Sequence, residues 1–174
     1  MEKEAAEASF LELVQWSRGG REALTRCMKQ RLSLPRIDPA AYAAFLQLEK
    51  YLAESPLEPR HKHLIKLRAS QLNGCAYCVD MHVREALRDG EDARRLHALV
   101  VWRDTPFFDE RERALLALTE EVTKIEGRVS DETYELAERV LGEGYLAAVL
   151  MAAITINAWN RLGIATEMQP ALST

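Results

Sequence analysis

Residues 67–82 run Leu67-Arg68-Ala69-Ser70-Gln71-Leu72-Asn73-Gly74-Cys75-Ala76-Tyr77-Cys78-Val79-Asp80-Met81-His82. The apolar positions before Asn73-Gly74 have helical spacing, and this dipeptide is a typical helix end. A second helix, which carries the cysteines, begins directly after the glycine and ends at Asp89-Gly90. Cys75, Cys78 and His82 are positions i, i+3 and i+7, so we expect all three on one face of this helix.

This spacing favours reversible thiol chemistry. A thiol becomes a good nucleophile when its thiolate is stabilised, and the positive end of the helix dipole does this at a helix N-terminus. His82 follows Cys78 by four residues, so it can accept the thiol proton or pair with the thiolate. If Cys78 attacks a peroxide it becomes a sulfenic acid, with which Cys75 can condense to form a disulfide. An external dithiol must then reduce the pair.

Other interpretations of the cysteines stay open at this point. Buried cysteines are common as inert core residues. A zinc site would need a fourth ligand besides Cys75, Cys78 and His82, and the candidates are His61 and His63. Three ligands from one helix make a poor tetrahedral cage, which counts against a metal. A thioredoxin-like βαβ scaffold is excluded because the sequence has no strand patterns.

Helical periodicity also dominates the rest of the chain. Further helices are expected over residues 2–18, 38–53, 59–73, 91–102, 109–126, 130–141 and 145–162. Asp38-Pro39, the acidic run from Asp109 and Ser130 are typical of helix starts. The predicted fold class is therefore all-α, with one helical domain over residues 31–174 and an N-terminal helical extension over residues 1–30.

The composition narrows the function classes. A chain of 174 residues can bury a core of its own, and its net charge of −4 gives nucleic acid or anionic lipid no basic surface. The richest apolar run, residues 145–156, is too short to span a membrane. The acidic start, residues 1–4, is not typical of an export signal. Three cysteines make no disulfide framework, so we expect a cytoplasmic protein in which the third, Cys27, is a bystander.

The run from Leu67 to His82 closely resembles the core of the alkylhydroperoxidase AhpD-like family, which belongs to the carboxymuconolactone decarboxylase superfamily. Three further blocks are similar to the family: residues 39–52, residues 102–114 and residues 156–162. The resemblance covers about residues 35 to 165, and several separate blocks make chance agreement improbable. It implies an all-α, AhpD-like helical domain, in agreement with the periodicity.

The resemblance also implies an activity. In the family the second cysteine, here Cys78, attacks peroxide, and the first, here Cys75, resolves the sulfenic acid. The histidine, here His82, belongs to a proton relay. The centre works without metal, haem or flavin, and electrons return from a dithiol partner such as a lipoyl domain or a thioredoxin-like protein. Members form homo-trimers or homo-hexamers with active sites near subunit contacts.

One position departs from the family pattern. The family relay includes a glutamate twelve residues before the first cysteine, and His63 stands at that place here. An imidazole can also move protons near neutral pH, so His63 is a candidate member of the relay. Glu120 or Glu121 could instead supply the missing carboxylate, although we expect both on a solvated helix face.

Three functions follow from these residues. The first is a thiol-dependent peroxidase that reduces organic or hydrogen peroxide through Cys75 and Cys78. The second is a non-catalytic redox sensor or binding protein in which the disulfide switches assembly or partner contacts; the substituted glutamate position favours it. The third, decarboxylation of a lactone, does not require a cysteine pair, so a chain that carries this pair is the poorer candidate.

Overall fold

The structure is a computed structural model that describes residues 30–171, and these residues contain helices and no strands. The expected all-α fold is thus confirmed. The predicted extension over residues 1–30, with Cys27, lies outside the described residues apart from its last position. The elements are α2 Leu34–Ile37, α3 Pro39–Glu54, α4 Pro59–Asn73, α5 Ala76–Arg88, α6 Ala93–Ala98, η1 Leu99–Asp104, α7 Glu110–Thr123, η2 Ile125–Gly127, α8 Asp131–Leu141 and α9 Glu143–Ala165.

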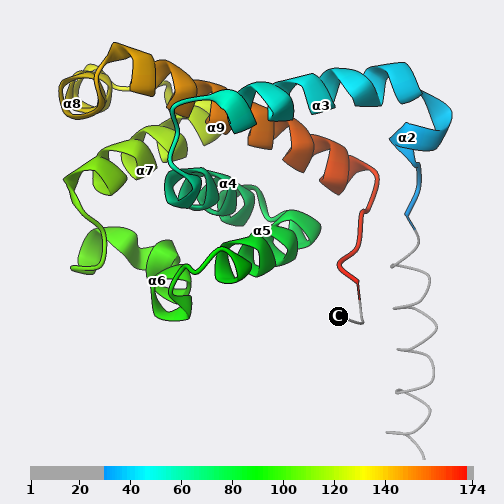
Figure 1. Cartoon of the computed structure of the whole chain (residues 1–174), viewed down its shortest axis with the longest axis horizontal. Helices are drawn as coiled ribbons and strands as arrows, with labels where there is room; N and C mark the ends of the chain where they lie inside the picture. The colour runs from blue at the N-terminus through cyan, green and yellow to red at the C-terminus, as the bar shows by residue number, and fades with distance from the viewer. Residues whose placement is uncertain (1–29, 172–174) are drawn as a thin grey trace, which may run out of the picture.

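α4, α7 and α9 form the centre of the bundle and pack against one another (Figure 1). α5 packs against α4, and α8 packs against α7. α3 lies along α9, so the first described long helix and α9 are side by side although they are far apart in sequence. The core is made of leucines and small residues from these helices, among them Leu64, Leu67, Leu115 and Ala152. The cysteine helix α5 is therefore held by α4 on one side and reaches α9 at one end.

α9 is the central apolar helix. By length and composition alone it could cross a membrane, and among residues 30–171 it is the only such helix. Its buried positions, which include Val149, Ile156 and Asn160, instead face α4 and α7. This is the packing of a core helix.

Capping residues explain most helix boundaries. Asp38 caps α3 and Ser130 caps α8 through their side chains, and Asp109 forms a capping box with Glu112 at the start of α7. The segment 91–102 differs from the prediction, because it divides into α6 and η1, with a non-helical residue at Val101. α9 begins and ends a few residues beyond the predicted range 145–162 and includes Gly144 and Gly163. A glycine inside a helix costs only about 1 kcal/mol, and the burial of one face of α9 offsets this cost.

Two buried carboxylates of α7 connect this helix to α4, α6 and η1 through ion pairs and hydrogen bonds. Glu112 is fully buried and bonds Arg60 of α4 and Arg95 of α6, each at 2.6 Å. Glu120 accepts from Arg68, Arg103 and the Trp102 indole. Our expectation of a solvated Glu120 is therefore wrong, because the surrounding arginines make its burial tolerable. The pKa of Glu112 is lowered, since burial would raise it but the two arginines outweigh that effect.

Replacing Glu112 by glutamine should lower the free energy of unfolding by about 3 kcal/mol, because two arginines would lose their counter-charge in a buried place. Urea denaturation followed by circular dichroism measures this. Glu110→Gln, two residues earlier on the exposed side of the same helix, is the matched control and should cost less than about 0.5 kcal/mol. Equal denaturation midpoints for the two variants would contradict the assignment.

Candidate active site

A left-handed glycine places the cysteines. Gly74 ends α4 with φ 71°, a conformation that residues with a side chain rarely adopt. The chain then turns so that the Cys75 N–H donates to the Ser70 carbonyl at 3.1 Å. Cys75 is the extended residue just before α5, and Cys78 lies in the first turn of that helix. Both sulfurs therefore lie at the positive end of the α5 dipole, although Cys75 itself is not helical.

The two thiols are reduced and buried beneath α9. Cys75 is 2% and Cys78 3% exposed. Gly163 of α9 lies directly above them: a Cβ there would stand 3.1 Å from the Cys75 sulfur and 3.7 Å from the Cys78 sulfur. The missing side chain thus allows the α9 backbone to approach both sulfurs closely.

The thiols share one proton. The pKa of Cys75 is lowered to about 6, because its thiolate accepts a hydrogen bond from the Cys78 thiol and is further stabilised by Asn160 and backbone N–H groups, against the opposing effect of burial. The pKa of Cys78 is raised, because its thiol donates to Cys75 and because it is buried. Above pH 6 the pair therefore carries one negative charge and one proton.

This charge predicts a pH dependence. The thiolate of the pair should form as pH rises through about 6 in the folded chain, and not near the ordinary thiol value of about 8.5. Thiolate absorbance of a Cys27→Ser variant, which leaves only the pair, measures the midpoint. The same variant in denaturant is the control, and its midpoint should return to about 8.5. A folded-state midpoint near 8.5 would mean that the pair does not share a proton.

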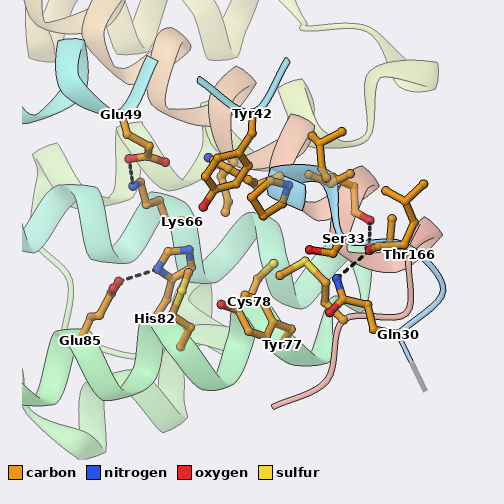
Figure 2. Close-up of a pocket in the computed structure, with 18 residues that line it drawn as sticks. Gln30, Ser33, Tyr42, Glu49, Lys66, Tyr77, Cys78, His82, Glu85 and Thr166 are labelled. Carbon is orange, nitrogen blue, oxygen red and sulfur yellow. Dashed lines mark hydrogen bonds and ion pairs between the residues drawn. The ribbon is translucent and has the colours of Figure 1, made fainter. Parts of the chain in front are cut away.

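Cys78 and His82 line one pocket of about 370 Å³, and Cys75 is not among its lining residues. Figure 2 shows both side chains directed into the space between α5, α4 and α3. The apolar wall consists of aromatic and aliphatic side chains from several elements, including Tyr42, Tyr77, Met81, Ile156, Trp159, Leu162 and Met168. A bound molecule would therefore meet the Cys78 sulfur first, with Cys75 behind it against Gly163.

One ring nitrogen of His82 is hydrogen-bonded, and the other has no hydrogen-bond partner among the described residues. Nδ1 lies 3.0 Å from Oε2 of Glu85, one turn later on α5 (Figure 2). The pKa of Glu85 is lowered, chiefly by this hydrogen bond, so Glu85 is a carboxylate that accepts from Nδ1–H. Nε2 is buried and has no hydrogen-bond partner among residues 30–171. In the tautomer that Glu85 selects, the Nε2 lone pair is therefore free to take a proton.

The structure brings together three of the four residues predicted from sequence. Cys75, Cys78 and His82 share the site. His63 bonds Asp89 at 2.9 Å, at the far end of α5, and lines a different hollow. A relay role for His63 stays a prediction. His61 bonds Tyr145, and residues 30–171 contain no group of three or more metal-ligating side chains.

Sequence reasoning missed the carboxylate of the site and part of its wall. Glu85 follows His82 by three residues, a spacing that puts two side chains side by side on a helix and could have indicated the pair. Lys66 and Glu49 form a 2.6 Å ion pair on the wall opposite, between α4 and α3. No local pattern joins these two residues, because their helices meet only in the folded bundle.

An all-helical bundle that buries two thiols at a helix start, beside a carboxylate-bound histidine, defines an AhpD-like thiol protein. Residues 39–121 match the model of the carboxymuconolactone decarboxylase family. The chain belongs to this family, and a solved structure named for AhpD, 38% identical to it, agrees with that assignment.

Two relatives are similar over most of their length. The uncharacterized protein YdfG of Bacillus subtilis is 37% identical over 139 residues, which are 79% of this chain and 95% of YdfG. The crystal structure of a candidate antioxidant defence protein AhpD of unknown function, from Agrobacterium tumefaciens, has a TM-score of 0.81 and 38% identity, over 83% of this chain and all of that one. The debrominase Bmp8, with a TM-score of 0.72 and 21% identity over 78% of this chain and 73% of its own, shares the fold alone.

Proposed function

We propose that this chain is a thiol-dependent peroxidase that reduces an organic or hydrogen peroxide and cycles between a dithiol and a Cys75–Cys78 disulfide. The observation that carries the proposal is the joint position of Cys78 and His82. Both line the same pocket, one turn apart on α5, with a proton-accepting nitrogen of His82 left without a partner. The second thiol is held within reach behind the first.

The first step oxidises Cys78. His82 Nε2 takes the remaining thiol proton, and the Cys78 sulfur attacks the peroxide oxygen farther from the organic group. An S–O bond forms and the O–O bond breaks, so that the sulfur loses two electrons and becomes a sulfenic acid. The departing alkoxide takes the proton from His82 and leaves as an alcohol, or as water when the substrate is hydrogen peroxide.

The second step closes the disulfide. The Cys75 thiolate attacks the Cys78 sulfur, an S–S bond forms and the S–O bond breaks. The hydroxide that leaves takes up a proton from solvent and becomes water. An external dithiol then donates two electrons and two protons, which regenerates both thiols and oxidises the donor to its own disulfide. One of the two protons passes to solvent as the Cys75 thiolate forms again.

The donor and the assembly are part of the proposal. The 2–3% exposure of Cys75 and Cys78 favours a dithiol on a slender arm, such as a lipoyl group, over a thioredoxin-like surface, because a long arm can reach buried residues that a broad protein surface cannot. By resemblance to the family, we propose a homo-trimer or homo-hexamer that works in the cytoplasm.

Peroxide consumption by the reduced chain, with dihydrolipoamide present and thiols counted before and after, tests the function. We expect sustained consumption of cumene hydroperoxide, with two thiols lost on oxidation and recovered on reduction. Two thiols lost once, without turnover by any dithiol and with a change in oligomer size, would replace the peroxidase with the redox sensor. No loss of thiols would return the cysteines to a structural role.

A further inference from the structure

A buried chain of amide side chains connects α4 and α9 next to the cysteines. Asn160 is fully buried, and its Nδ2 donates to the Ser70 hydroxyl at 3.0 Å. Asn73 donates to the side-chain oxygens of Asn157 and Asn160, each at 2.9 Å. Ser70 in turn donates to the Lys66 carbonyl at 2.7 Å. These residues flank the turn that leads into Cys75.

The residues at the two ends of this chain of amide side chains determine which group donates and which accepts in each of its hydrogen bonds. Arg161 can only donate, and it donates to Oδ1 of Asn157 at 3.2 Å, while the Ala153 carbonyl can only accept, and it accepts from Nδ2 of Asn157 at 2.8 Å. Asn73 must therefore donate to Oδ1 of Asn157, and likewise to Oδ1 of Asn160. The Asn160 amide then has one orientation, with its oxygen toward Asn73 and both N–H bonds on the opposite side.

One of those two N–H bonds is engaged by Ser70, because the Ser70 hydroxyl already donates elsewhere and must accept here. The other has no further partner among the described residues, and Asn160 lies one turn before Gly163 on the face of α9 that covers the sulfurs. This N–H is therefore available to the pair, and the Asn160 side chain acts to lower the pKa of both thiols. Gly163, three residues later on the same face of α9, confirms how closely this face lies over the pair, since its Cβ would be 3.1 Å from the Cys75 sulfur.

We infer that Asn160 is a catalytic residue, the side-chain donor that stabilises the negative charge of the Cys75–Cys78 pair, and that the amide chain from Asn73 to Arg161 exists to hold it in the donating orientation. A sulfur bound by an oriented amide N–H keeps its charge at a lower pH than one surrounded by apolar groups. The inference rests on the proposed function for its role in turnover, but ionisation of the pair can be measured without any substrate.

The test is thiolate titration of Asn160→Ala and Asn160→Asp in the Cys27→Ser background. We expect the ionisation midpoint of the pair to rise by about one pH unit in the alanine variant. It should rise further in the aspartate variant, which sets an acceptor and a like charge against the sulfurs. The charged and titratable side chains around the pair are unchanged in the alanine variant: Tyr42, Glu49, Lys66, Tyr77, His82, Glu85 and Arg161.

Thr155→Val is the matched control. It removes a fully buried polar group from the same helix, and the Thr155 hydroxyl has no hydrogen-bond partner among the described residues, so it lies outside the amide chain. Its midpoint should stay within about 0.3 units of the parent. An unshifted Asn160→Ala, or equal shifts in both variants, would overturn the inference.

A second measurement uses the unaltered protein, in case the variants do not fold. The side-chain amide resonance of Asn160 in a nitrogen-15 spectrum should titrate with the same midpoint as the thiols, and it should move when the disulfide forms. A resonance that is indifferent to both changes would overturn the inference. Failure of the peroxide assay would leave this result untouched, because the titration uses the reduced chain alone.

Discussion

Cys78→Ser should abolish peroxide consumption, with a loss on the order of 10³-fold or more. Cys78 is the only cysteine among the residues that line the described pocket, so its sulfur is the one that a peroxide can reach. A hydroxyl in its place is far less acidic and cannot be oxidised in the same way. Loss of absorbance of a ferrous-xylenol orange assay, with dihydrolipoamide as the donor, measures the remaining peroxide.

Two further cysteine variants make this test specific. Cys75→Ser should lose sustained turnover but still react once, leaving a sulfenic acid at Cys78 that dimedone traps and mass spectrometry locates. Cys27→Ser should consume peroxide like the parent. If the sulfenic acid instead forms on Cys75 in a Cys78→Ser chain, the roles of the two thiols are reversed, which the charge on Cys75 would then explain.

His82→Gln should reduce the rate of sulfenic acid formation by about 10²-fold or more, the usual contribution of a general base. Glutamine fills similar space and can bond Glu85, but it has no nitrogen that accepts a proton at Nε2. Glu85→Gln should have a smaller effect of about tenfold, because a neutral amide fixes the orientation and tautomer of His82 less firmly than the carboxylate does.

Asp80→Asn is the control for both changes. Asp80 lies on α5 between Cys78 and His82, but it pairs with Arg84 on the solvated side of the helix. Its rate and pH profile should match those of the parent. Stopped-flow measurement of a single oxidation separates these effects from the reductant. If His82→Gln reacts as fast as Asp80→Asn, the thiol proton leaves by another route and the role given to His82 is wrong.

Local sequence signals predicted most of the fold, because helix boundaries depend on nearby residues. Caps such as Asp38 and Ser130 act within one turn, and the left-handed Gly74 separates α4 from α5 as expected. The predictions failed where tertiary packing determines the helix boundaries. A single helix over 91–102 requires every residue to stay helical, whereas burial of the Trp102 side chain against Glu120 accompanies a tighter turn and a break at Val101.

The site residues that lie close together in the sequence could be predicted, whereas those that the fold brings together from distant segments could not. Cys75, Cys78 and His82 come from one short segment, and their spacing alone indicates the chemistry. Asn160 lies far along the chain, and nothing in its local sequence points to the cysteines. His63 was considered by its place in a motif, yet its contact with Asp89 depends on how α4 and α5 cross.

The contact between Asn160 and Ser70 joins residues 90 positions apart, and this separation governs when the chemistry appears during synthesis. The cysteine segment leaves the ribosome with α4 and α5, long before α9 has been made. Until α9 docks, neither the Asn160 amide nor the backbone at Gly163 covers the sulfurs, so the two thiols lack the shielding and the part of their stabilisation that α9 supplies. The complete site therefore forms only when α9 packs against α4 and α5.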